Sequence, residues 1–300
     1  MGEGHPECPQ RLDAIEDRLL ITGVGNALER REPNPASLAE LELAHGRMHI
    51  AALRGLSDAL RDEMAAGGPA HTHLDPDTAL NAHTWEAALL SAGAAIDATE
   101  AVLAGELANA FCATRPPGHH ACRDKAMGFC FFNNVAVAAK FALERHGLQR
   151  VAVIDFDVHH GNGTEDIVAG DERILMCSFY QHPFYPEWPH ADAPNLVNLP
   201  VPAYTKGLDI RELVEQHWLP RLEAHRPEML FISAGFDGHR EDDMGQMGLV
   251  EQDYAWITQR LVEVARRHAQ GRIVSCLEGG YHLSALARSV EAHLRVLADV

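Results

Sequence analysis

The stretch VAVIDFDVHHGNGT, residues 151–164, begins as a strand and ends in chemically reactive side chains. Its first four residues are apolar and mostly β-branched, which is typical of a buried strand. Asp155, Asp157 and His159 follow at every second position, and such side chains share one face of an extended chain. An Asp/His pair at this spacing forms half of an open zinc site, although two solvated acids beside a surface histidine explain this stretch alone equally well.

The bulk composition is that of a globular protein. The chain has 300 residues, of which 46% are hydrophobic and 23% charged, and α/β proteins of this length often form one domain. The net charge of −18 argues against a nucleic-acid-binding surface, which is normally basic. It suits a cationic small molecule or a Lys-rich peptide, and it equally suits plain solubility.

Cysteine usage and hydropathy predict a cytoplasmic protein. None of the six cysteines belongs to a CxxC pair, so a disulfide framework is not expected and a reducing compartment is favoured. We find no signal peptide and no apolar run long enough to span a membrane. No interface can be recognised, so a homo-oligomer is left open.

Short apolar strands alternate with helices, which predicts a parallel sheet covered on both faces and therefore an α/β fold. A turn at Gly161–Gly163 precedes a short helix that Thr164 can cap, and a loop rich in proline and aromatic residues covers 181–202. We expect helices at 9–20, 49–65, 84–104, 134–145, 209–225, 250–269 and 283–298, and strands at 40–44, 109–114, 151–154, 174–178, 229–233 and 273–277.

Four predicted strands end in polar residues beside glycine. Ligands bind outside the carboxyl ends of parallel strands, so these four endings should meet on one rim. Glycine there permits tight turns and close approach of the backbone. The endings are Arg115–His120, Asp155–Gly163, Gly235–Asp237 and Glu278–Tyr281.

The rim supplies a candidate metal site. Asp157, His159 and Asp237 would provide one nitrogen and two carboxylate ligands for zinc, a set that also suits Fe(II) or Mn(II). Asp155 is better placed to accept a hydrogen bond from a neighbouring histidine, or to bind a structural cation.

The same rim supplies candidate catalytic groups. His119 and His120 follow two prolines and are therefore held rigidly; each suits proton shuttling or electrostatic support. Tyr281 follows two glycines and could donate its hydroxyl to a developing oxyanion, the alternative being a core tyrosine.

These motifs together resemble the zinc-dependent histone deacetylase superfamily, above all its class II members and the bacterial histone-deacetylase-like and acetylpolyamine amidohydrolases. HPECPQRL near the start is similar to the N-terminal motif of that family. The resemblance covers nearly the whole chain and rests on RPPGHHA (115–121), GFCFFNNVAVAA (128–139), DFDVHHGNGTED (155–166), SAGFDGHR (233–240) and LEGGY (277–281).

The resemblance implies the three-layer arginase/deacetylase fold as a single catalytic domain over 1–300, with zinc on the Asp157, His159 and Asp237 set. His120 would be the general base and acid, and His119, hydrogen-bonded to Asp155, its electrostatic partner. Tyr281 would polarise the acyl carbonyl. Asn162 stands where other branches carry aspartate beside the general base, and asparagine is the pattern of the class II-like branch.

The family pattern also implies a substrate tunnel and a cation site. Arg11 would lie by an internal channel for the acetate product. The walls of the acyl-lysine tunnel would be Phe129 and Tyr185, with Gly128 and Met244 beside them. A structural K⁺ would bind near Asp155, Asp157, His159, Ser178 and Phe179, partly through main-chain carbonyls.

Two positions depart from the family pattern. The chain begins almost at its N-terminal motif, so either its start is mis-assigned or trimmed, or the strand that relatives place before this motif is missing together with part of the rim. Met244 stands where many relatives carry leucine and some polyamine-specialised members carry glutamate. Because Met244 offers no charge to a polyamine cation, we expect no strict polyamine specificity.

The sequence therefore predicts a zinc-dependent hydrolase of linear amides, which removes acetyl or another small acyl group from acyl-lysine or a related amine through metal-activated water. One alternative is an acetylpolyamine amidohydrolase. A second is an arginase-like bimetallic ureohydrolase, although the single Asp237 and the Tyr281 ending speak against it. A third is a non-enzymatic acyl-ligand sensor.

Overall fold

Six parallel strands form the central sheet of the computed structural model, which describes residues 2, 4–68, 71–189 and 191–300. The strand order is β3-β8-β7-β4-β5-β6. Their bounds are β3 Ala110–Cys112, β4 Val151–Asp155, β5 Ile174–Gln181, β6 Leu196–Val201, β7 Leu230–Ala234 and β8 Ile273–Leu277.

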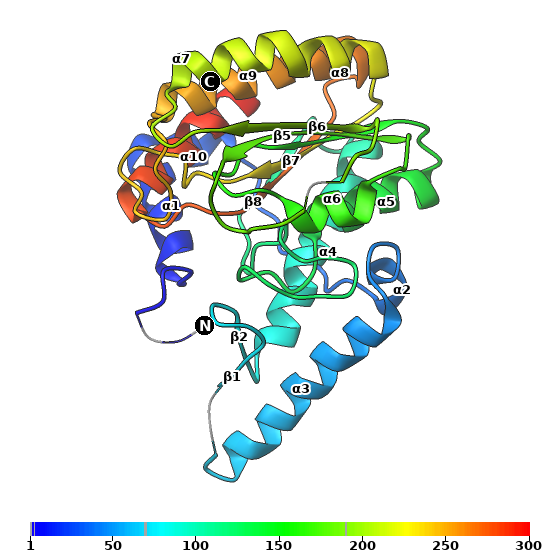
Figure 1. The fold of residues 1–300 in the computed structure, drawn as a ribbon, viewed down its shortest axis with the longest axis vertical. Coiled ribbons are helices and arrows are strands. Elements are labelled where there is room, and N and C mark those ends of the chain that lie inside the picture. The colour runs from blue at the N-terminus through cyan, green and yellow to red at the C-terminus, as the bar shows by residue number, and fades with distance from the viewer. Residues whose placement is uncertain (1, 3, 69–70, 190) are drawn as a thin grey trace.

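Helices cover both faces of this sheet, and Figure 1 shows the two helical layers above and below it. One layer contains α1 (Gln10–Thr22), α7 (Gly207–Leu213), α8 (Leu219–His225), α9 (Glu251–His268) and α10 (Leu283–Leu297). The other contains α2 (Leu38–Leu41), α3 (Arg47–Ala65), α4 (Thr84–Leu103), α5 (Asn134–His146) and α6 (Asn162–Val168). The predicted α/β architecture with a central parallel sheet is confirmed.

Strand β4 shows why both faces are covered. Val151 and Val153 belong to the core cluster beneath α4 and α5, whereas Ala152 and Ile154 belong to the cluster beneath α9 and α10. All four side chains are fully buried. Alternate side chains point to opposite faces of a strand, so a continuous apolar run requires a helical layer on each side.

The position of β4 in the sheet determines where a ligand can bind. The chain passes from β4 outward to β5 and β6, and then returns to the other side of β4 with β7 and β8. β4 and β7 are therefore neighbours at the point where the strand order reverses, and a crevice opens at such a point outside the carboxyl ends of the strands.

Three predictions about elements were wrong. Residues 40–44 were expected as a strand, but helix α2 covers Leu38–Leu41 because Ser37 and Glu40 form a capping box at its start. The loop expected at 181–202 contains β6, whose residues pair with β5 at the edge of the sheet. Thr164 lies inside α6 rather than at its cap, and its hydroxyl accepts a hydrogen bond from Asn133 instead.

Other elements begin and end within a few residues of the prediction. The helix expected at 209–225 is made of α7, a π-helical turn at Val214–Trp218 and α8. A small antiparallel hairpin, β1 (His71–His73) with β2 (Ala79–Asn81), was not predicted. Within the described residues, no helix is both long and apolar enough to cross a membrane.

Candidate metal centre and active site

The predicted rim lies at the carboxyl ends of the central strands. His159 follows β4 by four residues, and Asp237 follows the neighbouring β7 by three. His120 follows β3, and Tyr281 follows β8. The reversal of strand order thus brings together side chains that are far apart in the sequence.

Asp157, His159 and Asp237 form a buried group whose ligand atoms lie within 4.8 Å of one another. The Nδ1 atom of His159 is 3.0 Å from Oδ1 of Asp157 and 3.2 Å from Oδ2 of Asp237. Oδ2 of Asp237 is buried and makes no hydrogen bond of ordinary geometry among the described residues. A buried carboxylate is normally satisfied by hydrogen-bond donors, a charged partner or a metal, and this donor set fits a divalent metal ion.

Charge repulsion between the carboxylates supports the same interpretation. Burial and the negative charge of Asp157 raise the pKa of Asp237 to about 6. Although burial opposes ionisation of Asp157, the charges of His119 and His159 hold its pKa well below the usual range. A divalent cation between the two carboxylates would remove the conflict, because it favours the charged form of both.

Glycine at the end of β8 makes room for the metal ligands. A Cβ atom at Gly279 would lie 2.0 Å from Oδ2 of Asp237 and 2.6 Å from Oδ2 of Asp157. The amide of Gly279 instead donates a hydrogen bond of 2.9 Å to Oδ2 of Asp157. Only glycine permits this close approach of backbone to carboxylate.

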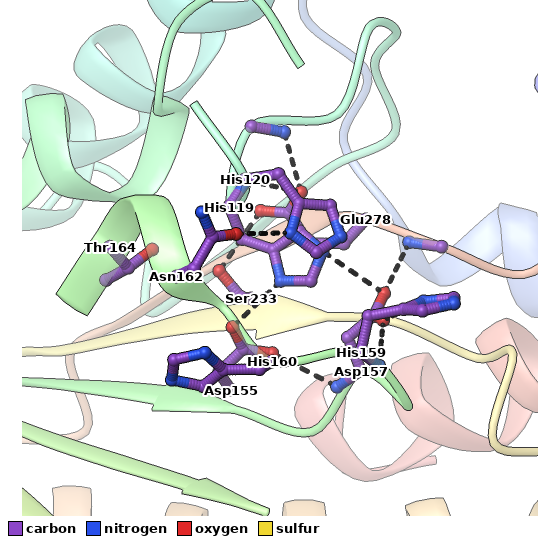
Figure 2. A network of polar contacts seen from close by, with 12 residues as sticks. His119, His120, Asp155, Asp157, His159, His160, Asn162, Thr164, Ser233 and Glu278 are labelled. Carbon is purple, nitrogen blue, oxygen red and sulfur yellow. Dashed lines mark hydrogen bonds and ion pairs between the residues drawn. The ribbon is translucent and has the colours of Figure 1, made fainter. Parts of the chain in front are cut away.

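His119 lies between two carboxylates. Its Nδ1 is 3.0 Å from Oδ2 of Asp155, as Figure 2 shows, and its Nε2 is 3.7 Å from Oδ2 of Asp157. Burial opposes protonation, but the charges of Asp157 and Asp155 raise the pKa of His119 well above its ordinary value. The two carboxylates therefore favour the positively charged form of His119.

His120 lies beside His119, but its hydrogen-bond partner is a neutral amide instead of a carboxylate. Its Nδ1 is 2.8 Å from the amide oxygen of Asn162, and the two imidazole rings are 4.0 Å apart (Figure 2). Burial and the charges of His119 and His159 lower the pKa of His120 well below its ordinary value. The surroundings of the two adjacent histidines therefore favour different forms, the charged form for His119 and the neutral form for His120.

Glu278 holds the turn that carries both histidines. Its Oε2 accepts hydrogen bonds from the amides of Gly118 at 2.7 Å and His119 at 3.1 Å, and its Oε1 accepts one from Ser233 at 3.0 Å. Burial raises the pKa of Glu278 to about 7. The sequence placed Glu278 on the rim but gave it no role, because its partners come from the turn after β3 and from β7.

The backbone before Tyr281 is fixed by Arg11. The buried guanidinium of Arg11 donates hydrogen bonds to the carbonyl oxygens of Glu278 and Gly280, and it lies 4.9 Å from the centre of the Tyr281 ring. Burial raises the pKa of Tyr281 well above its ordinary value, against the opposing charge of Arg11. Tyr281 thus stays a neutral phenol that can donate a hydrogen bond.

A cavity of about 230 Å³ opens onto these groups. Phe129, one of the expected walls, has a positive φ of 68°, a conformation that costs energy for a residue with a side chain. The described cavity lining contains His120, His159 and Tyr281, the expected tunnel residues Gly128, Phe129, Tyr185 and Met244, and three further residues, Asp77, Phe184 and Asp243. A larger surface hollow of about 500 Å³, lined by residues between Val201 and Gln216, contains none of the expected site residues.

The three further lining residues could not be found from the sequence alone. Phe184 stacks on the ring of His159 with centroids 5.4 Å apart, and it is the immediate neighbour of the expected wall Tyr185. That adjacency in an aromatic loop was the only available signal. Asp77 and Asp243 come from separate loops in which acidic residues are common.

The expected cation residues also lie together. Ser178 pairs with Asp155 in the register between β5 and β4, and Phe179 is the next residue of β5. The hydroxyl oxygen of Ser178 is buried without a hydrogen bond among the described residues. An acceptor oxygen left in this state beside a carboxylate fits a cation.

Comparison with known proteins gives one consistent result. A model of the histone deacetylase domain matches residues 5–297. The histone deacetylase-like amidohydrolase of Pseudomonas aeruginosa is 38% identical over 286 residues, covering 93% of this chain and 73% of that protein. The polyamine deacetylase HDAC10 of Mus musculus is 38% identical over 299 residues, covering 95% of this chain and 43% of that protein.

A solved structure shares the fold. The crystal structure of the HDA15 HD domain superposes with a TM-score of 0.90 at 32% identity, covering 100% of this chain and 84% of that chain. The six-stranded sheet with its two helical layers is therefore the arginase/deacetylase fold.

Proposed function

Because the chain belongs to the histone deacetylase family and is an enzyme that hydrolyses acyl amides, we propose that it removes acetyl or another small acyl group from acyl-lysine or a related amine. One observation supports this proposal most directly. The group formed by Asp157, His159 and Asp237 lies at the same cavity as His120. A metal-binding group beside a neutral histidine can supply both a polarising ion and a proton acceptor, which together suit hydrolysis of an unactivated amide.

We propose that the metal is zinc, held by Asp157, His159 and Asp237, with Fe(II) as an alternative for the same donor set. When bound, such an ion polarises the amide carbonyl and lowers the pKa of water. The buried Oδ2 of Asp237 has no hydrogen bond of ordinary geometry and lies 3.2 Å from Nδ1 of His159, an arrangement that supports this assignment.

His120 is the proposed general base and acid. Its Nδ1 is engaged by Asn162, so its Nε2 is the nitrogen left to take a proton from the attacking water and to return it to the leaving amine. Its lowered pKa keeps it neutral, and therefore able to accept that proton, at the start of the reaction.

Tyr281 and His119 are the proposed stabilising groups. The phenol of Tyr281, kept neutral by its raised pKa, would donate a hydrogen bond to the carbonyl oxygen as negative charge develops there. The positive charge of His119, maintained by Asp155, would lower the energy of that developing charge from a distance.

We also propose a structural K⁺ near Asp155, Asp157, His159, Ser178 and Phe179. The buried, unpaired hydroxyl oxygen of Ser178 supports it. Such a cation would lie behind the metal ligands and offset part of the charge of Asp155.

The shape of the cavity supports a linear substrate. About 230 Å³ between Phe129 and Tyr185 suits an acylated alkyl chain rather than a bulky group. One specific observation favours an acetylated polyamine as second candidate: Asp77 and Asp243 line the same cavity, and two carboxylates attract a second ammonium group. Met244 adds no charge to this pair, so we rank the acyl-lysine substrate first.

We further propose a cytoplasmic enzyme that forms a single catalytic domain and does not act on nucleic acids. The six cysteines are free, five of them are buried, and the net charge is −18.

The test of the function is amine release by zinc-loaded protein, measured side by side on an acetyl-lysine peptide and an acetylated polyamine, with metal-free protein as control. We expect zinc-dependent release with a preference for the peptide. Tyr281→Phe should fold normally and lose most turnover, and full activity in that variant would overturn its assigned role. Release from neither substrate by the wild-type protein would contradict the proposed substrate class.

A further inference from the structure

We propose that two sulfur atoms, Sγ of Cys122 and Sδ of Met127, act as positioning groups that fix the side-chain amide of Asn162 and through it the tautomer of His120. The inference rests on the proposed role of His120 as general base. None of the comparisons or motifs assigns a role to either sulfur.

The amide of Asn162 is fully buried and has partners on both sides. Its Oδ1 is 2.8 Å from Nδ1 of His120, and its Nδ2 lies 3.4 Å from Sγ of Cys122 and 3.4 Å from Sδ of Met127. Figure 2 shows Asn162 with its amide oxygen toward the ring of His120. Every polar atom of this amide is therefore accounted for.

Toward Asn162 the two sulfurs can act only as hydrogen-bond acceptors. A thioether carries no hydrogen, so Met127 cannot donate. Burial raises the pKa of Cys122 to about 12, so it remains a thiol, and its single hydrogen points to the carbonyl oxygen of His120 at 3.7 Å. Both sulfurs thus offer lone pairs to Asn162, and they favour the amide orientation in which the NH₂ group of Asn162 faces them.

The amide orientation decides which nitrogen of His120 carries the proton. A carbonyl oxygen only accepts, so Nδ1 of His120 must be the N–H and Nε2 must hold the lone pair. If the amide of Asn162 were reversed, its NH₂ would face Nδ1, the proton would move to Nε2, and the base would be blocked. The orientation of an asparagine side chain must be fixed by its neighbours, because its amide has an oxygen on one side and an NH₂ group on the other. An aspartate has an oxygen on both sides.

The loop that carries the sulfurs is held firmly. The amide of Cys122 donates to the carbonyl of Lys125 at 2.9 Å, and Met127 and Cys130 exchange two hydrogen bonds of 3.1 and 2.9 Å. Both sulfur-bearing residues are buried. Rigid placement is what a weak acceptor requires if it is to bias an equilibrium between two orientations.

The sharpest test is a cycle of variants in two backgrounds. The double variant Met127→Leu/Cys122→Ala removes both sulfur acceptors. It is compared in two backgrounds, the natural chain and the Asn162→Asp variant. Because aspartate presents an acceptor oxygen on either side, the sulfurs should matter only beside asparagine. We expect kcat to fall about fivefold in the natural chain, with KM and zinc content unchanged, and less than about twofold in the Asn162→Asp background.

Two further measurements keep the proposal falsifiable. Cys122→Ser retains a donor and an acceptor and should restore most of the loss when combined with Met127→Leu. Nitrogen NMR of ¹⁵N-histidine-labelled, zinc-loaded wild-type protein, assigned with His120→Ala, should show a protonated Nδ1 and a bare Nε2. Equal losses in both backgrounds, or a proton on Nε2, would overturn the proposal. The NMR result stands even if no amide substrate is cleaved, so it separates this inference from the proposed function.

Discussion

His119 and Asp155 form a buried pair in which Nδ1 of the imidazole lies 3.0 Å from Oδ2 of the carboxylate. Neither side chain is exposed beyond a few per cent. His120, the next residue, faces the neutral amide of Asn162 instead. The carboxylate favours a charged imidazole at His119, and the neutral amide leaves His120 neutral, so the partner of each ring favours a different form.

The first prediction concerns the charge of His119. Asp155→Asn should lower kcat about 10- to 100-fold, because the positive charge of His119 loses its carboxylate partner. Steady-state kinetics and zinc content would be measured together, and Asp62→Asn on the exposed face of α3 is the matched control. Repeating the assay over a range of K⁺ concentrations separates the role of Asp155 beside His119 from its proposed role in cation binding. Wild-type kcat in Asp155→Asn would contradict the assigned charge.

The second prediction is a pH profile. The reaction needs unprotonated His120, and burial with the charge of His119 lowers its pKa, so the acidic limb of kcat/KM should lie below pH 6.5. Asn162→Asp places a negative charge at Nδ1, favours the protonated ring and should move that limb to higher pH. The variant would then lose more activity at pH 6 than at pH 8. An acidic limb at the same pH in both proteins would exclude His120 as the group that titrates.

Much of the site could be predicted because its signals are local in the sequence. Asp157, His159 and Asp237 each come within four residues after an apolar strand, and parallel strands bring their carboxyl ends to one rim whatever the connections between them. The His119 and His120 pair follows the same rule. For Asp157 and His159 the spacing within one short stretch already predicts a shared face, and Asp237 joins them because β7 pairs with β4.

The remaining features depend on neighbours that are distant in the sequence. The capping box of Ser37 and Glu40 outweighed the apolar pattern of the strand expected at 40–44. The edge strand β6 exists because β5 offers it a hydrogen-bonding partner, which composition does not reveal. The contact of Met127 with Asn162 depends on how a loop folds back over α6, and methionine spacing carries no signal for that.

The third prediction concerns the metal. Chelation should abolish activity and lower the melting temperature by about 5 °C, because three buried ligands lose the ion that stabilises them and the folded state loses its binding energy. Added zinc should restore both. Asp237→Ala should bind less than one zinc per chain, while Asp243→Asn in the same loop should bind one. Full occupancy in Asp237→Ala would remove Asp237 from the ligand set.

The fourth prediction concerns Glu278. Removing its carboxylate in Glu278→Ala leaves the buried amides of Gly118 and His119 without an acceptor, which costs about 1–3 kcal/mol for each. The turn should loosen, and kcat/KM should fall about tenfold or more. Glu278→Gln keeps one acceptor oxygen for both amides and should stay within about threefold of wild type. If the two variants were equally impaired, the charge of Glu278 rather than its hydrogen bonds would be the essential feature.

The last prediction concerns substrate choice at the cavity mouth. Met244 lines the cavity together with Asp77 and Asp243 but contributes no charge of its own. In Met244→Glu a third carboxylate joins this group, and the preference for acetylated polyamine over acetyl-lysine peptide should rise about fivefold in kcat/KM, the gain expected from one exposed ion pair.

Met244→Gln, which has nearly the same size and no charge, is the matched control and should leave the preference unchanged. Because the added attraction is between exposed charges, raising the salt concentration should weaken it. An equal shift in Met244→Gln would mean that shape rather than charge selects the substrate. No shift in either variant would place the selection on Asp77 and Asp243, whose replacement by asparagine would then lower the rate on the polyamine alone.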